Sequence, residues 1–180
     1  MATMIDTLRQ EHADIARLLD LVEQQVDGED VPDYGLLHEI VEYCLTYPDQ
    51  YHHPKEDLIY QALCRHDPRA TPAIADLEAE HEELTVLTRE FETVIERARA
   101  RAADGDPDAS DGLKQMARAF LDYYRQHIDQ EESLFFPDAE RMLGPEEWAE
   151  LEAQVSDPTD PLHRETVSLR LSALFERAAV

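Results

Sequence analysis

Four long segments of the sequence repeat apolar residues at helical spacing, and short runs rich in proline, glycine and aspartate separate them. Side chains three or four positions apart share one face of an α-helix, so each segment predicts a helix with one buried stripe. The predicted helices cover residues 3–25, 33–65, 71–103 and 112–135. Thr71 and Pro72 provide an N-cap and a first helical residue for the third helix, and Pro137 is expected to end the fourth.

The second predicted helix contains Pro48 and Pro54, each of which removes an amide donor. We therefore expect a kink or break near them. Two shorter helices are predicted after the fourth. One begins at Gly144-Pro145 and contains Trp148, and the other runs from Asp160-Pro161 to the C-terminus.

The sequence has no strand pattern and only five glycines. It predicts an all-α protein, an antiparallel up-down-up-down four-helix bundle over residues 1–140. Residues 141–180 are expected to form C-terminal helices that pack on the bundle within the same domain. These helices would either cap the bundle or support contacts in a homodimer.

The formal net charge of −25 argues against nucleic acid or an anionic membrane surface as a partner, because phosphate binding needs clustered lysine and arginine. The sequence has no run of about 18 apolar residues, so it predicts no membrane-spanning helix. The start of the chain lacks a signal-peptide pattern, and Cys44 and Cys64 form no close-spaced metal pair. These features lead us to expect a reducing, cytoplasmic location.

Each long predicted helix places a histidine on or near its apolar stripe, and two of the helices add a glutamate four residues later. A residue four places further along a helix is rotated by only about 40°, so each such pair shares a face. The histidines are His12, His52, His81 and His127, and the glutamates are Glu56 and Glu131.

Counting residues from the turns places these six side chains at one depth in the bundle, to within about one or two turns at ~1.5 Å per residue. Burial of unpaired charges there would cost several kcal/mol or more. Imidazole and carboxylate ligands suit iron, manganese or zinc. Two carboxylates on opposite helices can bridge a pair of metals, which leaves open positions for a small molecule.

Two neighbouring residues have more than one interpretation. His53 and Asp57 also fit a pair spaced by four, but Glu56 shares its face with apolar residues further along the helix. His53 is therefore predicted to support the site or to serve as a spare ligand. Tyr123 lies four residues before His127, and its hydroxyl could hydrogen-bond a bound oxygen species or could reach solvent from a packed ring.

The remaining histidines are predicted to lie at the surface or at the edge of the core. They are His38, His66 and His163. Cys44 is predicted to be a packed core residue rather than a reactive thiol.

The chain resembles the hemerythrin-like, or HHE cation-binding, family over roughly residues 8–137. The resemblance lies in RQEH ending at His12, HHPKED at 52–57, EHEEL around His81 and HIDQEESLFFP from His127. It implies an antiparallel four-helix bundle that holds a non-haem di-iron centre with an oxo or hydroxo bridge. By that similarity, Glu56 and Glu131 would be the bridging carboxylates and the four on-stripe histidines the terminal ligands.

The chain departs from the oxygen-carrying hemerythrins, which have a second histidine one turn from the first on the third helix. Here the positions four away from His81 are Leu77 and Thr85. The chain thus looks like less-liganded members of the family, which are associated with oxygen, nitric oxide, peroxide or iron handling. The expected function is binding of O₂, NO or peroxide. The alternatives are a peroxide- or NO-metabolising enzyme, iron storage or delivery, and a structural zinc or mixed site.

Overall fold

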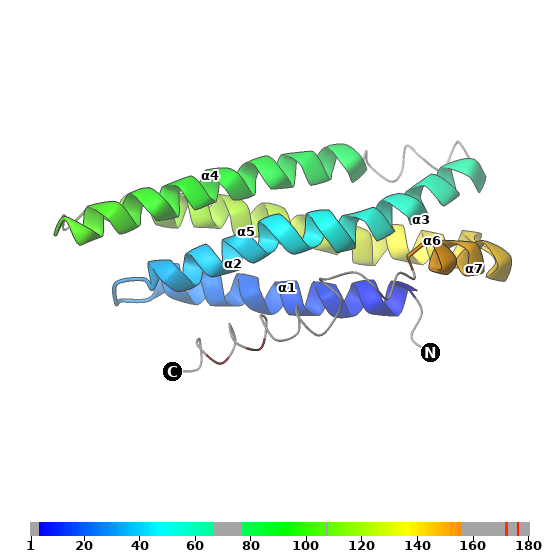
Figure 1. Ribbon diagram of the computed structural model, residues 1–180, viewed down its shortest axis with the longest axis horizontal. Helices are drawn as coiled ribbons and strands as arrows, with labels where there is room; N and C mark the ends of the chain where they lie inside the picture. The colour runs from blue at the N-terminus through cyan, green and yellow to red at the C-terminus, as the bar shows by residue number, and fades with distance from the viewer. Residues whose placement is uncertain (1–3, 67–76, 107, 156–171, 173–175, 177–180) are drawn as a thin grey trace.

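The computed structural model describes residues 4–66, 77–106, 108–155, 172 and 176, and all regular structure in this part of the chain is helical. The prediction of an all-α protein is confirmed for these residues. The helices are α1 (Met4–Asp27), α2 (Tyr34–Tyr47), α3 (His53–His66), α4 (Leu77–Ala103), α5 (Leu113–Gln130), α6 (Phe136–Met142) and α7 (Pro145–Gln154) (Figure 1). The predicted helix start at Thr71-Pro72 and the helix from Asp160 fall outside the described residues.

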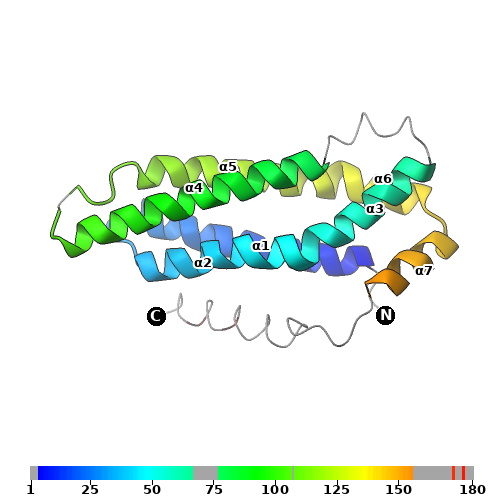
Figure 2. The same ribbon diagram turned by 45° about the horizontal axis from the view of Figure 1, so that its top comes forward.

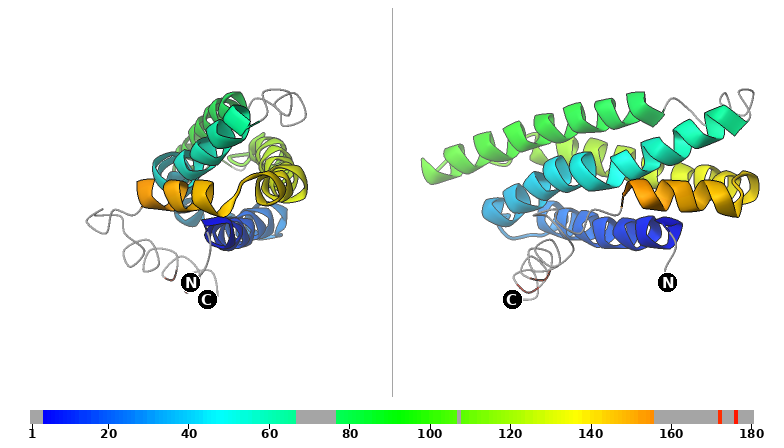
Figure 3. Two further views of the ribbon diagram at one scale, coloured as in Figure 1. Left: turned by 90° about the vertical axis from the view of Figure 1, so that its right-hand side faces the viewer. Right: turned by 45° about the vertical axis from the view of Figure 1, so that its right-hand side comes forward.

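The long helices lie side by side along the length of the molecule (Figures 1 and 2). In this arrangement α3 follows α2 with a bend, which Figure 2 shows, and α6 follows α5. Contacts join α1 to α2 and α5, and α4 to α2 and α5. The end-on view in Figure 3 shows these helices grouped around a shared interior. Within the described residues, no helix combines the length and the apolarity that crossing a membrane requires.

Two π-helical segments each join two α-helices into one long helical rod. The segment η1 (Pro48–His52) joins α2 to α3, and η3 (Glu131–Phe135) joins α5 to α6. The amide of His53 donates to the carbonyl of Pro48, and the amide of Phe136 donates to that of Glu131. Bonds that span five residues widen the helical turn, and such turns are frequent at functional sites. Each of the two His–Glu pairs therefore includes a residue in one of these wide turns.

The π-helical turns explain how the chain accommodates its prolines. At Pro48 the hydrogen-bonding pattern changes, and the rod continues into α3. The expectation that the fourth helix ends near Pro137 is wrong, because α6 continues to Met142. Pro137 lies in the first turn of α6, where a missing amide donor costs little.

Apolar side chains form two separate core clusters. The larger lies between α1, α2, α4 and α5 and includes Phe91, Phe120 and Tyr124. The second is built around Leu8, Ile59 and the α6 end of the molecule, and α7 adds Leu151. The helix predicted at Gly144-Pro145 is present as α7, and its Trp148 packs against this second cluster. Along α1, α4 and the two rods, the buried histidines and glutamates lie between the residues of the two clusters.

Candidate metal centre

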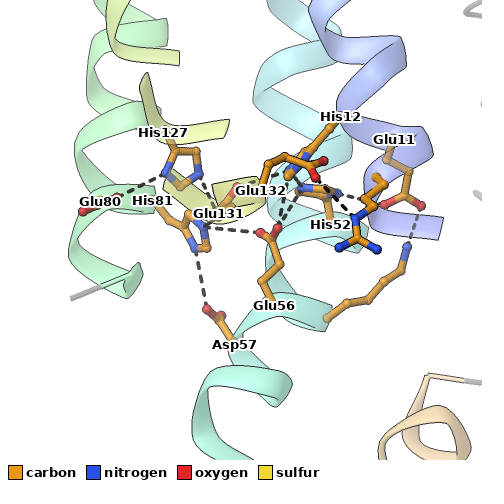
Figure 4. A network of polar contacts seen from close by, with 12 residues as sticks. Glu11, His12, His52, Glu56, Asp57, Glu80, His81, His127, Glu131 and Glu132 are labelled. Atoms are coloured by element: carbon orange, nitrogen blue, oxygen red, sulfur yellow. Dashed lines mark hydrogen bonds and ion pairs between the residues drawn. The ribbon is translucent and has the colours of Figure 1, made fainter. Parts of the chain in front are cut away.

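The structure brings all six predicted ligand residues together in the interior (Figure 4). His12 comes from α1, His81 from α4, and the two His–Glu pairs come from η1–α3 and α5–η3. The exposed fractions of the six residues range from 0% at Glu56 to 7% at His81. They are therefore held within the core, although their residue types ordinarily prefer water.

The two glutamates each face two groups of histidines. Glu56 places Oε1 at 3.1 Å from His52 Nε2 and 3.6 Å from His12 Nε2, while its Oε2 lies 3.5 Å from His81 Nε2. Glu131 places Oε2 at 3.2 Å from His12 Nε2, and its Oε1 at 3.2 Å from His127 Nε2. Each carboxylate therefore offers one oxygen to each half of the cluster.

His53 belongs to the same cluster and is 7% exposed. Its ring stacks on the ring of His81 at a centroid distance of 3.8 Å and an angle of 11°. Two sets of ligand atoms lie within 4.8 Å of one another: His53 with His81 and His127, and His12 with His52, Glu56 and Glu131. Adjacent positions of a helix point about 100° apart, which lets His52 and His53 serve different halves.

A carboxylate faces the outer nitrogen of each of four histidines (Figure 4). The Nδ1 atoms of His12 and His52 lie 3.0 Å from Glu132 and 2.8 Å from Glu11. Those of His81 and His127 lie 3.6 Å from Asp57 and 3.3 Å from Glu80. Carboxylates in this position orient a ligand imidazole and make its inner nitrogen a stronger donor.

The four carboxylates that face the Nδ1 atoms are called the outer carboxylates below. Their own partners differ between the half of the cluster with His12 and His52 and the half with His81 and His127. Glu11 accepts from Lys55 Nζ at 2.7 Å and from the Tyr47 hydroxyl at 2.9 Å. Glu132 lies 3.4 Å from Arg9 Nε. Among the described residues, neither Asp57 nor Glu80 has a lysine or arginine within ion-pair distance. The half that contains His81 and His127 is consequently the more negative one.

These contacts shift the pKa values of the histidines and glutamates in the cluster. Burial alone lowers the pKa of His12, but the carboxylates of Glu131 and Glu56 outweigh burial and raise this pKa to about 10. Burial likewise opposes the neighbouring carboxylates at His81, where Asp57 and the two glutamates raise the pKa to about 11. Burial would raise the pKa of Glu56, but the surrounding histidines lower it well below its usual range. The cluster is thus a set of buried charges that balance one another.

Comparison with known families supports a metal-binding interpretation of this arrangement. The family model described as "Hemerythrin HHE cation binding domain" matches residues 3–139. The chain belongs to the hemerythrin family. Comparisons with curated proteins and with solved structures found no match. The family is one of cation-binding domains, and the two groups of histidines and glutamates are where this hemerythrin-family chain could hold a metal.

The donor atoms of the centre fit a cation. Within the described residues, both oxygens of Glu56, both oxygens of Glu131, and the Nε2 atoms of His81 and His127 are buried and have no hydrogen-bond partner. Metal–nitrogen and metal–oxygen bonds of about 2.0–2.2 Å place neighbouring ligands roughly 3 Å apart. The Nε2 atoms of His12, His52, His81 and His127 lie 3.1–3.6 Å from these oxygens, which suits that requirement with small shifts.

The tyrosines near His127 are arranged differently from each other. The Tyr123 hydroxyl donates to Glu83 at 2.7 Å at the protein surface rather than to the buried centre. Tyr124 is the buried one, at 2% exposed, and its hydroxyl has no hydrogen-bond partner among the described residues.

The other titratable residues considered from the sequence lie outside the two candidate metal groups. His38 is half-buried near Glu92, and His66 is exposed beside Glu147, while His163 falls outside the described residues. Cys44 is 5% exposed in the larger core cluster, as expected for a packed residue, and burial raises the pKa of its thiol to about 12.

Glu11, Glu80 and Glu132 had no predicted role, and Asp57 was considered only as a partner of His53. Glu11 and Glu80 immediately precede His12 and His81 in the sequence, which could have drawn attention to them. However, Glu11 contacts His52, and Glu80 contacts His127, each on a different helix. Only the packing of the helices reveals those partners.

Proposed function

We propose that this chain is a non-haem di-iron protein, built as an antiparallel four-helix bundle, that binds a small oxygen or nitrogen species such as O₂, NO or peroxide. The observation that carries the proposal is the two-sided arrangement of Glu56 and Glu131, whose four oxygens face both halves of the cluster. A single ion would use one side of each carboxylate. Two ions use both sides.

The residues divide into two ligand sets. His12 and His52 would hold one ion, and His53, His81 and His127 would hold the other, while Glu56 and Glu131 would bridge them. His53 would supply the third nitrogen of its set. Mixed imidazole and carboxylate ligands suit iron, as they also suit zinc and manganese. Bound iron would supply one-electron redox chemistry and open coordination positions for the small ligand.

The chain's own residues would keep the centre ready for this task. The outer carboxylates fix the orientation of the imidazoles and draw the Nδ1 proton away from the ring. Phe136 stacks on His12 at a centroid distance of 5.3 Å and helps to exclude water from that half. The two core clusters on either side keep the donor atoms in a low-dielectric interior.

The test is elemental analysis of the protein purified in air, combined with its visible and near-ultraviolet spectrum. We expect about two irons per chain, charge-transfer bands in the oxidised protein, and new absorption bands when NO is added to the reduced protein. One iron per chain would contradict the two-ion arrangement. Zinc in place of iron, with no spectral response to NO or peroxide, would overturn the proposed ligand chemistry.

A further inference from the structure

A pocket of about 570 Å³ opens between α3 and α4 beside the candidate metal centre. The side chains that line it and carry the argument are His53, Asp57, His81, Glu82, Thr85 and Val86. Val86 is 57% exposed, so the pocket is continuous with solvent at this side of α4. It therefore connects solvent with two of the residues that belong to the centre.

The inner wall of the pocket consists of the stacked imidazole rings of His53 and His81. His81 is 7% exposed, and its Nε2 has no hydrogen-bond partner among the described residues. That nitrogen lies 3.5 Å from Glu56 and 3.6 Å from Glu131. The ring of His81 thus reaches from the pocket to both bridging candidates.

Two carboxylates line the pocket. Asp57 lies on its α3 side, with a buried Oδ1 that has no hydrogen-bond partner among the described residues, and Glu82 lies exposed on its α4 side. None of the described residues that line it is a lysine or arginine. The cations near the centre, Arg9 and Lys55, instead pair with the carboxylates behind His12 and His52.

We propose that this pocket is the entrance to the metal centre, and that its acidic lining admits divalent cations and uncharged small molecules while it slows anions. The inference rests on the proposed function, because it assumes that ions and a small ligand reach the centre. It narrows the small-ligand class to neutral species such as O₂, NO and hydrogen peroxide, and it disfavours azide, nitrite and superoxide.

The charge effect is local under physiological conditions. The Debye length is about 8 Å at 0.15 M ionic strength, so charges at the mouth act on an entering ion while distant charges are screened. Charge lining a cleft changes the association rate of charged ligands, and salt suppresses the change. Neutral molecules experience no such effect.

The experiment uses one variant that blocks the mouth of the pocket and one that reverses a charge at the mouth, each with a matched control. Val86→Trp fills the mouth from an exposed position, and Val31→Trp makes the same change at another exposed site. Glu82→Lys reverses a charge at the mouth. Glu96→Lys makes the same reversal on an exposed residue 14 positions further along α4, or about 21 Å away.

Three probes are followed by stopped-flow absorbance at 0.15 M ionic strength. Cobalt(II) uptake is measured on metal-free protein. Azide and NO binding are measured on protein loaded with iron. We expect Val86→Trp to slow all three probes at least threefold. We expect Glu82→Lys to speed azide about threefold, to slow cobalt(II) by a similar factor and to leave NO unchanged, with the charge effects lost at 1 M salt.

Unchanged rates for all probes in Val86→Trp would overturn the entrance. A Glu82→Lys variant that behaves like Glu96→Lys would overturn the charge selection. The cobalt(II) measurement separates this inference from the proposed function. Protein that takes up cobalt(II) through the pocket yet responds to neither azide nor NO would retain the entrance for cations and refute the small-ligand function.

Discussion

Glu56 and Glu131 present their four buried oxygens to two groups of histidines, with one oxygen of each carboxylate toward His12 and the other toward His81. Two buried carboxylates this close would repel each other if nothing positive lay between them. The surrounding imidazoles offset that repulsion when protonated. Metal ions offset it when the imidazoles are neutral. Most of the behaviour expected of this protein follows from competition between protons and metal ions for the same donor atoms.

Replacement of either bridging candidate by its neutral amide should remove metal. Glu56→Gln and Glu131→Gln keep the shape of the side chain but take away charge from both halves of the centre at once. We expect one ion or fewer per chain in each variant, measured by elemental analysis after loading and desalting. The control is Glu90→Gln, an exposed residue of α4 that should leave two ions. Retention of both ions in both bridge variants would rule out the shared-carboxylate arrangement.

His53→Ala should weaken one ion and spare the other. The structure groups His53 with His81 and His127, and not with His12 and His52. In an equilibrium cobalt(II) titration against a competing chelator, we expect one binding step to persist near its original affinity and the second to weaken at least tenfold. His66→Ala removes an exposed histidine and is the matched control. Two unchanged steps in His53→Ala would show that its ring only packs against His81.

Glu80→Gln should lower metal affinity without removing a ligand. Glu80 lies 3.3 Å from His127 Nδ1, and loss of such a partner typically costs 10–100-fold in metal affinity. Glu83→Gln is a close control, because Glu83 lies one turn away on α4 but bonds to the Tyr123 hydroxyl. The same cobalt(II) titration compares the two. Equal affinities in both variants would mean that the outer carboxylate does not act through the imidazole.

Much of this arrangement could be predicted from local sequence. Helical periodicity and spacing are local properties, so the four long helical segments and the shared face of His52 and Glu56 followed from counting residues. Depth counted from the turns was enough to expect His12 and His81 at the level of those pairs. The structure does bring these side chains together.

The remainder depended on features that periodicity cannot reveal. At Pro48, where the sequence favoured a kink or break, the α-helix gives way to the wide turn η1, and at Pro137, where the sequence favoured a stop, the helix continues as α6. His53 was predicted to have a supporting role because Glu56, and not Asp57, shares its helix face with the apolar Ile59 and Leu63. The site has two halves, so both adjacent histidines can contribute. Contacts of Glu80 and Glu11 with other helices depend on how the rods pack.

The two cysteines should differ in reactivity. Cys44 is buried, and its pKa of about 12 leaves about one thiolate in ten thousand at pH 8. Cys64 is only half-buried. We expect a thiol reagent to modify Cys64 in the native protein and both residues in denaturant. Rapid labelling of native Cys64→Ser protein would show that the core around Cys44 opens readily.

The stability of the metal-free protein should fall as the pH rises, whereas the affinity for metal should increase. In the metal-free centre, the pKa values of His12 and His81 are raised to about 10 and about 11, above about 6.5 for an unfolded histidine. The stability that these groups contribute is then fully present below pH 6.5 and is lost as the pH rises through their folded pKa values. The metal-free protein should therefore lose stability from this source progressively from pH 6.5 up to the folded pKa values of about 10 and about 11.

Metal binding requires neutral imidazoles, so loading must displace the protons that His12 and His81 carry at neutral pH. Affinity should rise with pH by up to about tenfold per unit for each displaced proton. Thermal unfolding with and without cobalt(II) from pH 6 to 8.5 should show a metal-induced increase in Tm that grows with pH, and an indicator dye should register proton release on loading. A constant increase in Tm, together with no released protons, would mean that these histidines are already neutral in the metal-free protein.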